Sequence, residues 1–295
     1  MSCRPDAVPP FVDLAWVRQH REVVLADVRW YADDRDPAAA YAAGHLPGAV
    51  RVDLDRGLAA PPTPEDGRHP LPDPGVFAEG MGKAGIGESD TVVAYDDAGG
   101  VVAARLVWML RALGLQAALL DGGLAAWDGP LSVDEETRPG AGFAPRPWPA
   151  ELLADIEEVA ALSRPTTLGG PPAVGPGQRP VLLDARSSAR YAGQPDALDP
   201  KAGHIPGARS FPCQDNLDES GRLLAAEILR SRLASVGVAE GGPATISSCG
   251  SGVTACHTLL VLDHLGLPGR LYPGSWSQWS RSDRPAATGP APWGS

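Results

Sequence analysis

The stretch Val181-Leu-Leu-Asp-Ala-Arg186, followed by Gly203-His-Ile-Pro-Gly-Ala208, decides the fold, because both motifs occur earlier in the chain. The earlier copies are Val24-Leu-Ala-Asp-Val-Arg29 and Gly44-His-Leu-Pro-Gly-Ala49. Motifs that recur in the same order at domain-length spacing predict that one structural unit is present twice. The architecture is therefore expected to be a tandem pair.

A later pair of stretches continues the repeat. Val92-Val-Ala-Tyr95 leads into Asp97-Ala-Gly-Gly-Val101, and Ala244-Thr-Ile-Ser247 leads into Cys249-Gly-Ser-Gly-Val253. Position 249 thus corresponds to position 97, 152 residues earlier, and the same offset relates Trp279 to Trp127. Such order and spacing are not expected by chance, so the two halves share one fold.

Each half alternates short apolar runs with helical runs, which predicts an α/β fold with a parallel sheet flanked by helices. Helices are expected over 101–113 and 253–265, each ending at a glycine in the left-handed conformation. Another helix is expected to start near Asp155, and 164–179 reads as a surface loop. The predicted domains are 1–135 and 152–295.

Bulk properties exclude several classes of protein. The net charge is −11, from 25 Lys and Arg against 36 Asp and Glu, which argues against nucleic acid or anionic membranes as partners. No apolar run approaches the roughly 20 residues of a membrane span, and no signal peptide is visible. Four cysteines in 295 residues do not suggest a disulfide framework, so a cytoplasmic location is expected.

The chemistry is expected at Cys249, which lies on a glycine-rich turn between a strand and a helix. Main-chain N–H groups and the positive helix end favour the thiolate there. Two differences set the halves apart: Asp97 stands where the second half has Cys249, and Asp33 stands where it has Arg190. A nucleophile and a cation in one half only suit a thiolate acting on an anionic substrate.

Other chemistries fit the Cys249 turn less well. A cysteine phosphatase needs an arginine six residues after the cysteine, where this chain has Ala255. No Gly-Lys-Ser/Thr follows, so the turn is no ATP-binding loop, and the cysteines and histidines lack zinc-ligand spacing. A persulfide, held by the amides around Gly250 and Gly252, fits a turn with so little side-chain bulk.

Residues present in both halves are interpreted as framework. This applies to the Asp-x-Arg pairs and to the histidines of the Gly-His-x-Pro-Gly motifs, since only one half carries a reactive group. The framework residues are Asp27, Arg29, His45, Asp184, Arg186 and His204. Cys256 is expected in the core.

These motifs together resemble those of the two-domain rhodanese-type sulfurtransferases over nearly the full length. The resemblance is carried by both Gly-His-x-Pro-Gly-Ala motifs, by Cys-x-x-Gly-Val-Thr-Ala at Cys249, and by Gly274-Ser-Trp-Ser-x-Trp279. It implies two tandem rhodanese-like domains, of which only the second is catalytic. Gly250-Ser251 after the cysteine is similar to the loop of the 3-mercaptopyruvate sulfurtransferases, whereas thiosulfate-preferring members carry polar or basic residues there.

The resemblance also implies the site residues. Cys249 is the nucleophile, and a serine–histidine–aspartate set that assists it matches Ser251, His69 and Asp55. The implied substrate-binding residues are Arg190, Gly250, Gly252, Val253 and Thr254. No metal or organic cofactor is implied.

One departure concerns the second substrate arginine of the mercaptopyruvate enzymes, nine residues after the first. That position is Asp199 here, with Lys201 nearby as an alternative cation. Lysine is a point charge and lacks the planar fork of arginine.

The expected function is transfer of a sulfane sulfur from a small anionic donor, through a Cys249 persulfide, to a thiol or to cyanide. 3-Mercaptopyruvate is the favoured donor and thiosulfate the alternative. The acceptor is expected to be a small thiol or a thioredoxin-like protein. The competing hypothesis is a non-catalytic sulfur carrier or regulatory module, against which the intact Cys249 turn argues.

Overall fold

The computed structural model describes residues 7–164 and 179–294. They form two compact units. Among these residues, unit 1 comprises 7–60, 71–149 and 217–223, and unit 2 comprises 61–70, 150–164, 179–216 and 224–294. The surface loop predicted over 164–179 lies almost entirely outside the described residues.

Unit 1 is built on a parallel sheet with the strand order β1-β5-β4-β2-β3. All four residues of β4 are buried, because helices cover both faces of a parallel sheet. The strands are β1 (Phe11–Val12), β2 (Val24–Asp27), β3 (Val50–Arg51), β4 (Val92–Tyr95) and β5 (Ala117–Leu120).

Four helices of unit 1, α1, α2, η1 and α3, begin at an aspartate whose side chain accepts a main-chain N–H group. At α3, for example, the Asp73 carboxylate accepts the N–H of Gly75, and Pro74 occupies the first turn. The helices are α1 (Leu14–Gln19), α2 (Pro37–Ala43), η1 (Leu54–Leu58), α3 (Pro74–Lys83), α4 (Ala104–Ala112) and η2 (Gly123–Ala126).

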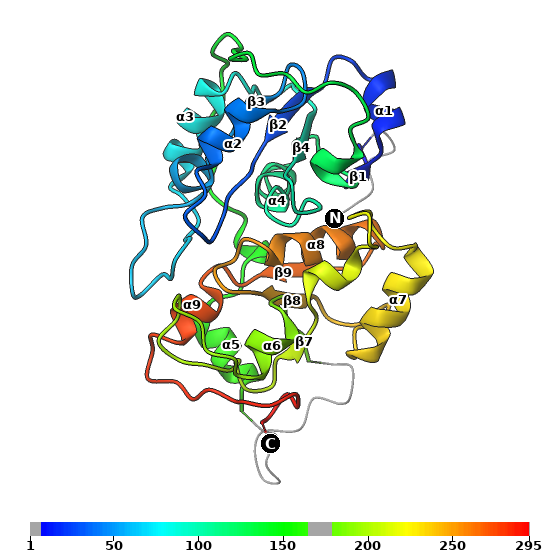
Figure 1. Cartoon of the computed structure of the whole chain (residues 1–295). Coiled ribbons are helices and arrows are strands. Elements are labelled where there is room, and N and C mark those ends of the chain that lie inside the picture. Colours follow the sequence, from blue (N-terminus) through cyan, green and yellow to red (C-terminus); the bar gives the residue numbers. More distant parts are fainter. Residues whose placement is uncertain (1–6, 165–178, 295) are drawn as a thin grey trace. The chain divides into compact units, whose positions relative to one another are not determined.

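Unit 2 repeats this plan with a parallel sheet in the order β7-β6-β8-β9. Figure 1 shows α8 next to β8 and β9. The strands are β6 (Leu182–Asp184), β7 (Arg209–Ser210), β8 (Thr245–Ser248) and β9 (Gly269–Leu271). Together the two sheets confirm the predicted α/β class with parallel sheets flanked by helices.

In unit 2, the sequence predicts the start of α5 near Asp155. Asp155 accepts the N–H of Glu158 at 2.8 Å and caps α5, so the predicted start near Asp155 is confirmed. The helices are η3 (Ala150–Leu152), α5 (Ile156–Leu162), α6 (Ser188–Ala192), η4 (Cys213–Asn216), α7 (Ala226–Ser235), α8 (Ala255–His264) and α9 (Ser275–Trp279).

The two long helices end where the glycines predicted. Gly114 follows α4 with φ +79° and Gly266 follows α8 with φ +72°, the left-handed conformation that glycine adopts without strain. Both helices start two or three residues later than expected, at Ala104 and Ala255, because the preceding residues form a turn.

The repeated Asp-x-Arg motifs form matching buried ion pairs. Arg29 bonds Asp27 and donates to the carbonyl of Gly44, and Arg186 bonds Asp184 in the same way. Arg186 also donates to the Gly203 carbonyl at 2.7 Å. In each unit the arginine therefore connects the end of a central strand to the following turn.

The repeated histidines also have matching surroundings. His45 stacks on Tyr41 with ring centroids 3.8 Å apart, and His204 stacks on Tyr191 at 3.7 Å. Each Nδ1 lies within hydrogen-bonding distance of the carbonyl of the tyrosine it stacks on. Both histidines are fully buried, which suits the framework interpretation.

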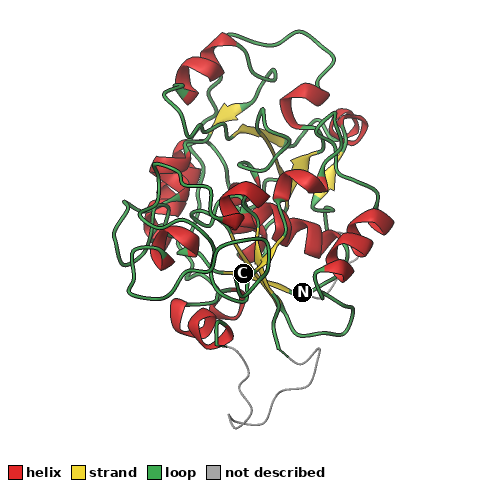
Figure 2. Ribbon diagram, turned by 60° about the horizontal axis from the view of Figure 1, so that its bottom comes forward, coloured by secondary structure: helices red, strands yellow, loops and turns green. Residues whose placement is uncertain are grey.

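Figure 2 shows short strands joined by long loops, in keeping with 35 glycines and 31 prolines in the chain. Among the described residues, no helix is long and apolar enough to cross a bilayer.

Candidate active site

Cys249 directly follows β8, at the carboxyl end of the central strand of unit 2. The turn 249–254 separates it from the first residue of α8. Its Sγ accepts the N–H of Gly252 at 3.1 Å, and its side chain interacts electrostatically with Arg186. Cys249 is only 2% exposed, and Arg186 is a charged side chain that interacts with it.

The segment around α9 is hydrogen-bonded to the main chain of the Cys249 turn. The N–H of Cys249 donates to Oγ of Ser275 at 3.0 Å, and the Cys249 carbonyl accepts the N–H of Trp276 at 3.0 Å. Ser277 donates its N–H to the Gly250 carbonyl at 2.8 Å. Ser275 adopts φ +51°, a rare value for a residue other than glycine. This backbone strain is maintained because three bonds fix the turn.

Two glycines of the turn meet different constraints. Gly252 has φ +75°, and a Cβ there would lie 2.4 Å from the carbonyl oxygen of Pro273, so no other residue fits. A Cβ at Gly250 would lie 3.1 Å from Nη2 of Arg68 and 3.6 Å from Nη2 of Arg190. The turn therefore brings main chain next to two guanidinium groups.

The equivalent turn of unit 1 is filled by one of its own side chains. The Asp96 carboxylate accepts four main-chain N–H groups at 2.7 to 2.8 Å, those of Ala98, Gly100, Val102 and Ala103. Burial raises the pKa of Asp96, and the four amides oppose that rise. In unit 1, the Asp96 carboxylate of the turn itself therefore takes the place that a bound anion would occupy.

Unit 2 has Ser248 at the position of Asp96, and the Ser248 hydroxyl donates to the Leu183 carbonyl instead. The N–H groups that correspond to those bound by Asp96 are at positions 250, 252, 254 and 255. One of them, on Gly252, reaches the Cys249 sulfur. The Gly252 amide of this turn therefore faces the thiol, where it can stabilise negative charge on the sulfur.

In unit 1, the residue equivalent to Cys249 is Asp97, which is hydrogen-bonded to a tyrosine. Tyr31 donates its hydroxyl to Oδ2 of Asp97 at 2.6 Å. Burial and the Asp97 carboxylate raise the pKa of Tyr31 to about 12, so the tyrosine stays a neutral donor. Neither group is a soft nucleophile at neutral pH.

His69 and Ser251 lie together in unit 2. Nδ1 of His69 is 2.7 Å from Oγ of Ser251, and both residues are buried. His69 belongs to the segment Pro61–Pro70, which packs in unit 2 although it precedes most of unit 1 in sequence. Two members of the predicted three-residue set are therefore in direct contact, next to Cys249.

Asp55, the third member of the predicted set, lies in η1 of unit 1. Its carboxylate accepts the indole N–H of Trp30 at 3.2 Å. Its part in the reaction stays a prediction.

Arg190 lies in α6, which begins at the cap residue Ser187. Its Nε donates to Oδ2 of Asp196 at 2.5 Å, and its Nη2 lies 3.5 Å from Oδ2 of Asp199. Burial would raise the pKa of Asp196, but Arg190 and two main-chain amides lower it overall, so that carboxyl is ionised. The guanidinium is thereby held beside Gly250.

The remaining predicted residues support the turn. Val253 is buried, and the Thr254 side chain hydrogen-bonds Cys213. Burial raises the pKa of Cys213 to about 12, so this cysteine stays a thiol. Cys256 is fully buried, as expected for a core residue, and its S–H donates to the Gly252 carbonyl at 3.3 Å. No cluster of three or more metal-binding side chains occurs among the residues that the structure describes.

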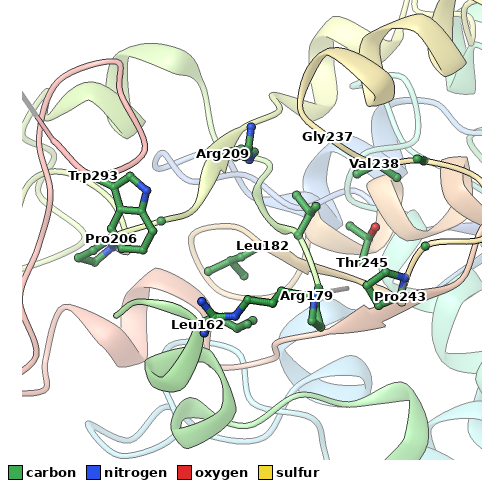
Figure 3. A pocket seen from close by; sticks show the side chains of 15 residues that line it. Leu162, Arg179, Leu182, Pro206, Arg209, Gly237, Val238, Pro243, Thr245 and Trp293 are labelled. Carbon is green, nitrogen blue, oxygen red and sulfur yellow. The ribbon is translucent and has the colours of Figure 1, made fainter. Parts of the chain in front are cut away.

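A separate pocket of about 500 Å³ lies at the opposite end of the unit 2 sheet. Figure 3 shows Leu182, Thr245, Arg209 and Trp293 around it. Leu182 and Thr245 are the first residues of β6 and β8, whereas Cys249 follows the last residue of β8. The pocket is therefore distinct from the Cys249 site.

The model of the rhodanese-like domain matches the chain twice, over residues 13–129 and 175–282. A probable 3-mercaptopyruvate sulfurtransferase of Pseudomonas aeruginosa is 40% identical over 278 residues, covering 91% of this chain and 93% of that protein. A putative thiosulfate sulfurtransferase of Mycobacterium tuberculosis is 35% identical over 99% of this chain and 100% of its own length. The crystal structure of SseA from Escherichia coli, a 3-mercaptopyruvate sulfotransferase, superposes with a TM-score of 0.76 at 32% identity, covering 92% of this chain and 100% of that one.

The fold, the repeated motifs and these matches define a two-domain rhodanese-type sulfurtransferase, which is an enzyme. The chain belongs to the family of rhodanese-like domain proteins, with two copies of the domain. The predicted family, fold and enzyme class are thereby confirmed.

Proposed function

We propose that this sulfurtransferase takes sulfur from 3-mercaptopyruvate onto Cys249 as a persulfide and passes it to a thiol or to cyanide. The observation that carries the proposal is the Cys249 turn. Its Sγ accepts the Gly252 N–H, and its amides lack the internal carboxylate that fills the equivalent turn of unit 1. A persulfide is a soft anion that these amides would stabilise.

In the first step the Cys249 thiolate attacks the sulfur of the donor. A sulfur–sulfur bond forms, the carbon–sulfur bond breaks, and its electron pair goes to the carbon as the enolate of pyruvate. The proton lost by the donor thiol ends on that carbon, which yields pyruvate and the Cys249 persulfide anion. No electron leaves the system, so no redox cofactor enters the balance.

Ser251 and His69 are proposed to carry that proton. Their 2.7 Å contact forms a short relay beside the sulfur, and hydroxyl–imidazole pairs serve this purpose in acid–base catalysis. Asp55 is proposed to assist, as the family resemblance implies. Arg190 is proposed to bind the donor carboxylate, because a guanidinium pairs with a carboxylate through two parallel hydrogen bonds.

In the second step an acceptor thiolate or cyanide attacks the outer sulfur. The sulfur–sulfur bond to Cys249 breaks, and Cys249 leaves as a thiolate, ready for another donor. The transfer is thus split into two displacements with ping-pong kinetics. A small thiol or a thioredoxin-like protein is the proposed biological acceptor.

The test of the persulfide is intact mass after exposure to 3-mercaptopyruvate. The wild-type chain is expected to gain one sulfur atom, which disappears when a small thiol is added. Cys249→Ser should gain none, and Cys213→Ala, which removes another buried thiol of unit 2, should gain one. Full turnover by Cys249→Ser would contradict the mechanism.

The choice of donor needs a separate measurement, because relatives carry both names. Gly250-Ser251 offers no charged side chain within the turn to bind the sulfonate end of thiosulfate, which favours 3-mercaptopyruvate. Initial rates with the two donors at matched concentrations decide between them. A strong preference for thiosulfate would overturn the choice of donor and leave the persulfide intact.

Two further predictions belong to this proposal. The functional domains are proposed to be 1–135 and 152–295, as the repeat indicates. The enzyme is proposed to work in the cytoplasm, where thiols stay reduced, and the described cysteines Cys213, Cys249 and Cys256 are free thiols.

A further inference from the structure

The buried carboxylate of Asp199 forms ion pairs with three arginines, and two of these, Arg68 and Arg190, border the Cys249 turn. Its side chain is 1% exposed, and its Oδ1 lies 2.6 Å from Nη1 of Arg68 and 3.2 Å from Nη1 of Arg281. Its Oδ2 lies 3.5 Å from Nη2 of Arg190. A buried carboxylate is costly unless it is paired, so the positions of these guanidinium groups are linked to Asp199.

Arg68 extends from Asp199 to the Cys249 turn. Its Nη1 donates to Asp199 and to the Leu198 carbonyl, while its Nη2 lies 3.1 Å from the position that a Cβ of Gly250 would take. The three heavy atoms nearest to that position all belong to Arg68 and Arg190. Both guanidinium groups therefore border the residue that follows the nucleophile.

The main chain of Arg68 is fixed to the structure that holds Cys249. Its N–H donates to Oγ of Ser277 at 2.9 Å, and the N–H of Ser277 donates to the Gly250 carbonyl. The next residue, His69, contacts Ser251. Arg68 is thus positioned by the same contacts as the groups proposed to act on the donor.

The side chains around Asp199 carry a net positive charge that one bound anion would neutralise. Arg68, Arg190 and Arg281 face two carboxylates, Asp196 and Asp199, so one positive charge is not balanced within the cluster. Nη2 of Arg190 is buried and makes no hydrogen bond among the described residues, since the carboxylate oxygen paired with it, Oδ2 of Asp199, lies 3.5 Å away. A buried donor without an acceptor is costly, and the carboxylate of a keto acid would supply both the charge and the acceptor.

Lys201, the alternative cation suggested by the sequence, is hydrogen-bonded to main-chain carbonyls. Its Nζ donates to the carbonyl oxygens of Ser282 and Arg284 at 2.5 and 2.9 Å. Those bonds hold the lysine against the chain that follows α9. Arg68 borders Gly250 and Lys201 does not, so Arg68 is the better candidate for the second donor-binding cation.

We propose that Arg68 binds the anionic end of the donor together with Arg190, and that Asp199 is a positioning residue that holds Arg68 over Gly250. This chain would then supply a second guanidinium for the donor from the segment Pro61–Pro70. The inference rests on the proposed sulfur transfer at Cys249 and names a residue that binds its substrate.

The test compares Arg68→Ala with Arg281→Ala, because both remove an ion pair of Asp199 and only Arg68 borders Gly250. With 3-mercaptopyruvate, Arg68→Ala should raise KM about 10- to 100-fold and change kcat much less, as expected for a lost charge-assisted hydrogen bond. Arg281→Ala should raise KM by about threefold or less. Arg68→Lys should give an intermediate KM, since it keeps the charge and loses the fork.

A binding measurement separates this inference from the proposed function. Pyruvate is titrated by calorimetry into Cys249→Ser, with and without Arg68→Ala or Arg281→Ala. Arg68→Ala should weaken pyruvate binding about as much as it raises KM. If the wild-type chain forms no persulfide, the proposed function fails, and the pyruvate titration still decides whether Arg68 binds a keto acid. Equal effects of the two arginine variants, or no effect of Arg68→Ala, would overturn the role of Arg68.

Discussion

Nδ1 of His69 lies 2.7 Å from Oγ of Ser251, although 182 residues separate them in the chain. The contact arises because the segment Pro61–Pro70 packs in unit 2, beside the turn that carries Cys249. The pair supplies the imidazole and the hydroxyl that are proposed above to carry the proton during sulfur transfer. The predictions below start from this pair and proceed outward.

Removing either member of the His69–Ser251 pair should slow persulfide formation. His69→Ala and Ser251→Ala are each expected to lower kcat with 3-mercaptopyruvate by about 100-fold or more, since a positioned proton carrier contributes that much. The double variant should be little worse than either single one, because the two groups act as a unit. Rapid-quench mass measurement of the persulfide tests this, with His20→Ala, which changes a half-buried histidine of unit 1, as control. Multiplicative losses would show that the pair does not act together.

Substitution of the two glycines of the Cys249 turn should have different effects. Gly252→Ala combines a positive φ with a 2.4 Å approach to the Pro273 carbonyl, so it should destabilise unit 2 by about 1 to 3 kcal/mol and abolish most activity. Gly250→Ala has no positive φ and should fold normally, but its Cβ displaces Arg68 and should raise the KM for the donor. Urea denaturation and steady-state kinetics on both variants check this. A stable, active Gly252→Ala would contradict the structural argument.

Asp96 should be among the most important polar residues for the stability of unit 1. Asp96→Ala leaves four main-chain N–H groups, three of them in buried bonds, without their acceptor. Each such loss is costly, so the free energy of unfolding should fall by about 3 kcal/mol or more. Asp97→Ala removes only the contact with Tyr31 and should cost about 1 kcal/mol. Denaturation followed by circular dichroism compares the two. Equal effects would mean that the carboxylate does not hold the turn.

Stability should fall in mild acid because of His257 in α8. Burial lowers the pKa of His257 to about 4, whereas an unfolded histidine titrates near 6.5. Between these values the unfolded chain binds more protons, so stability declines as pH falls through this window and levels off below it. The contribution is about 3 kcal/mol. His257→Leu should flatten the dependence of the free energy of unfolding on pH in this window. Urea denaturation at several pH values measures it. An unchanged slope would mean that other groups cause the loss of stability.

Much of the site could be predicted from local sequence. Cys249 lies on the turn after β8 and Asp155 caps α5, because strands, turns and caps depend on residues near one another in the chain. The sequence suggests Lys201 as a substitute cation, but its ammonium donates to two carbonyl oxygens instead. The sequence does not single out Arg68. Its only signal was its place directly before a candidate catalytic histidine, and a single arginine in a polar loop is usually a solvated surface charge.

The amino-acid sequence by itself determined that the chain contains one α/β fold twice, and that only the second copy has a thiol on its turn. Those properties follow from local hydrophobic pattern, glycine conformation and the identity of single residues. Only the tertiary structure decided that His69 contacts Ser251 and that Arg68, 131 residues from Asp199, is held over Gly250. The reason is physical: packing of Pro61–Pro70 in unit 2 is a long-range arrangement, and no local pattern encodes which distant charges share one buried carboxylate.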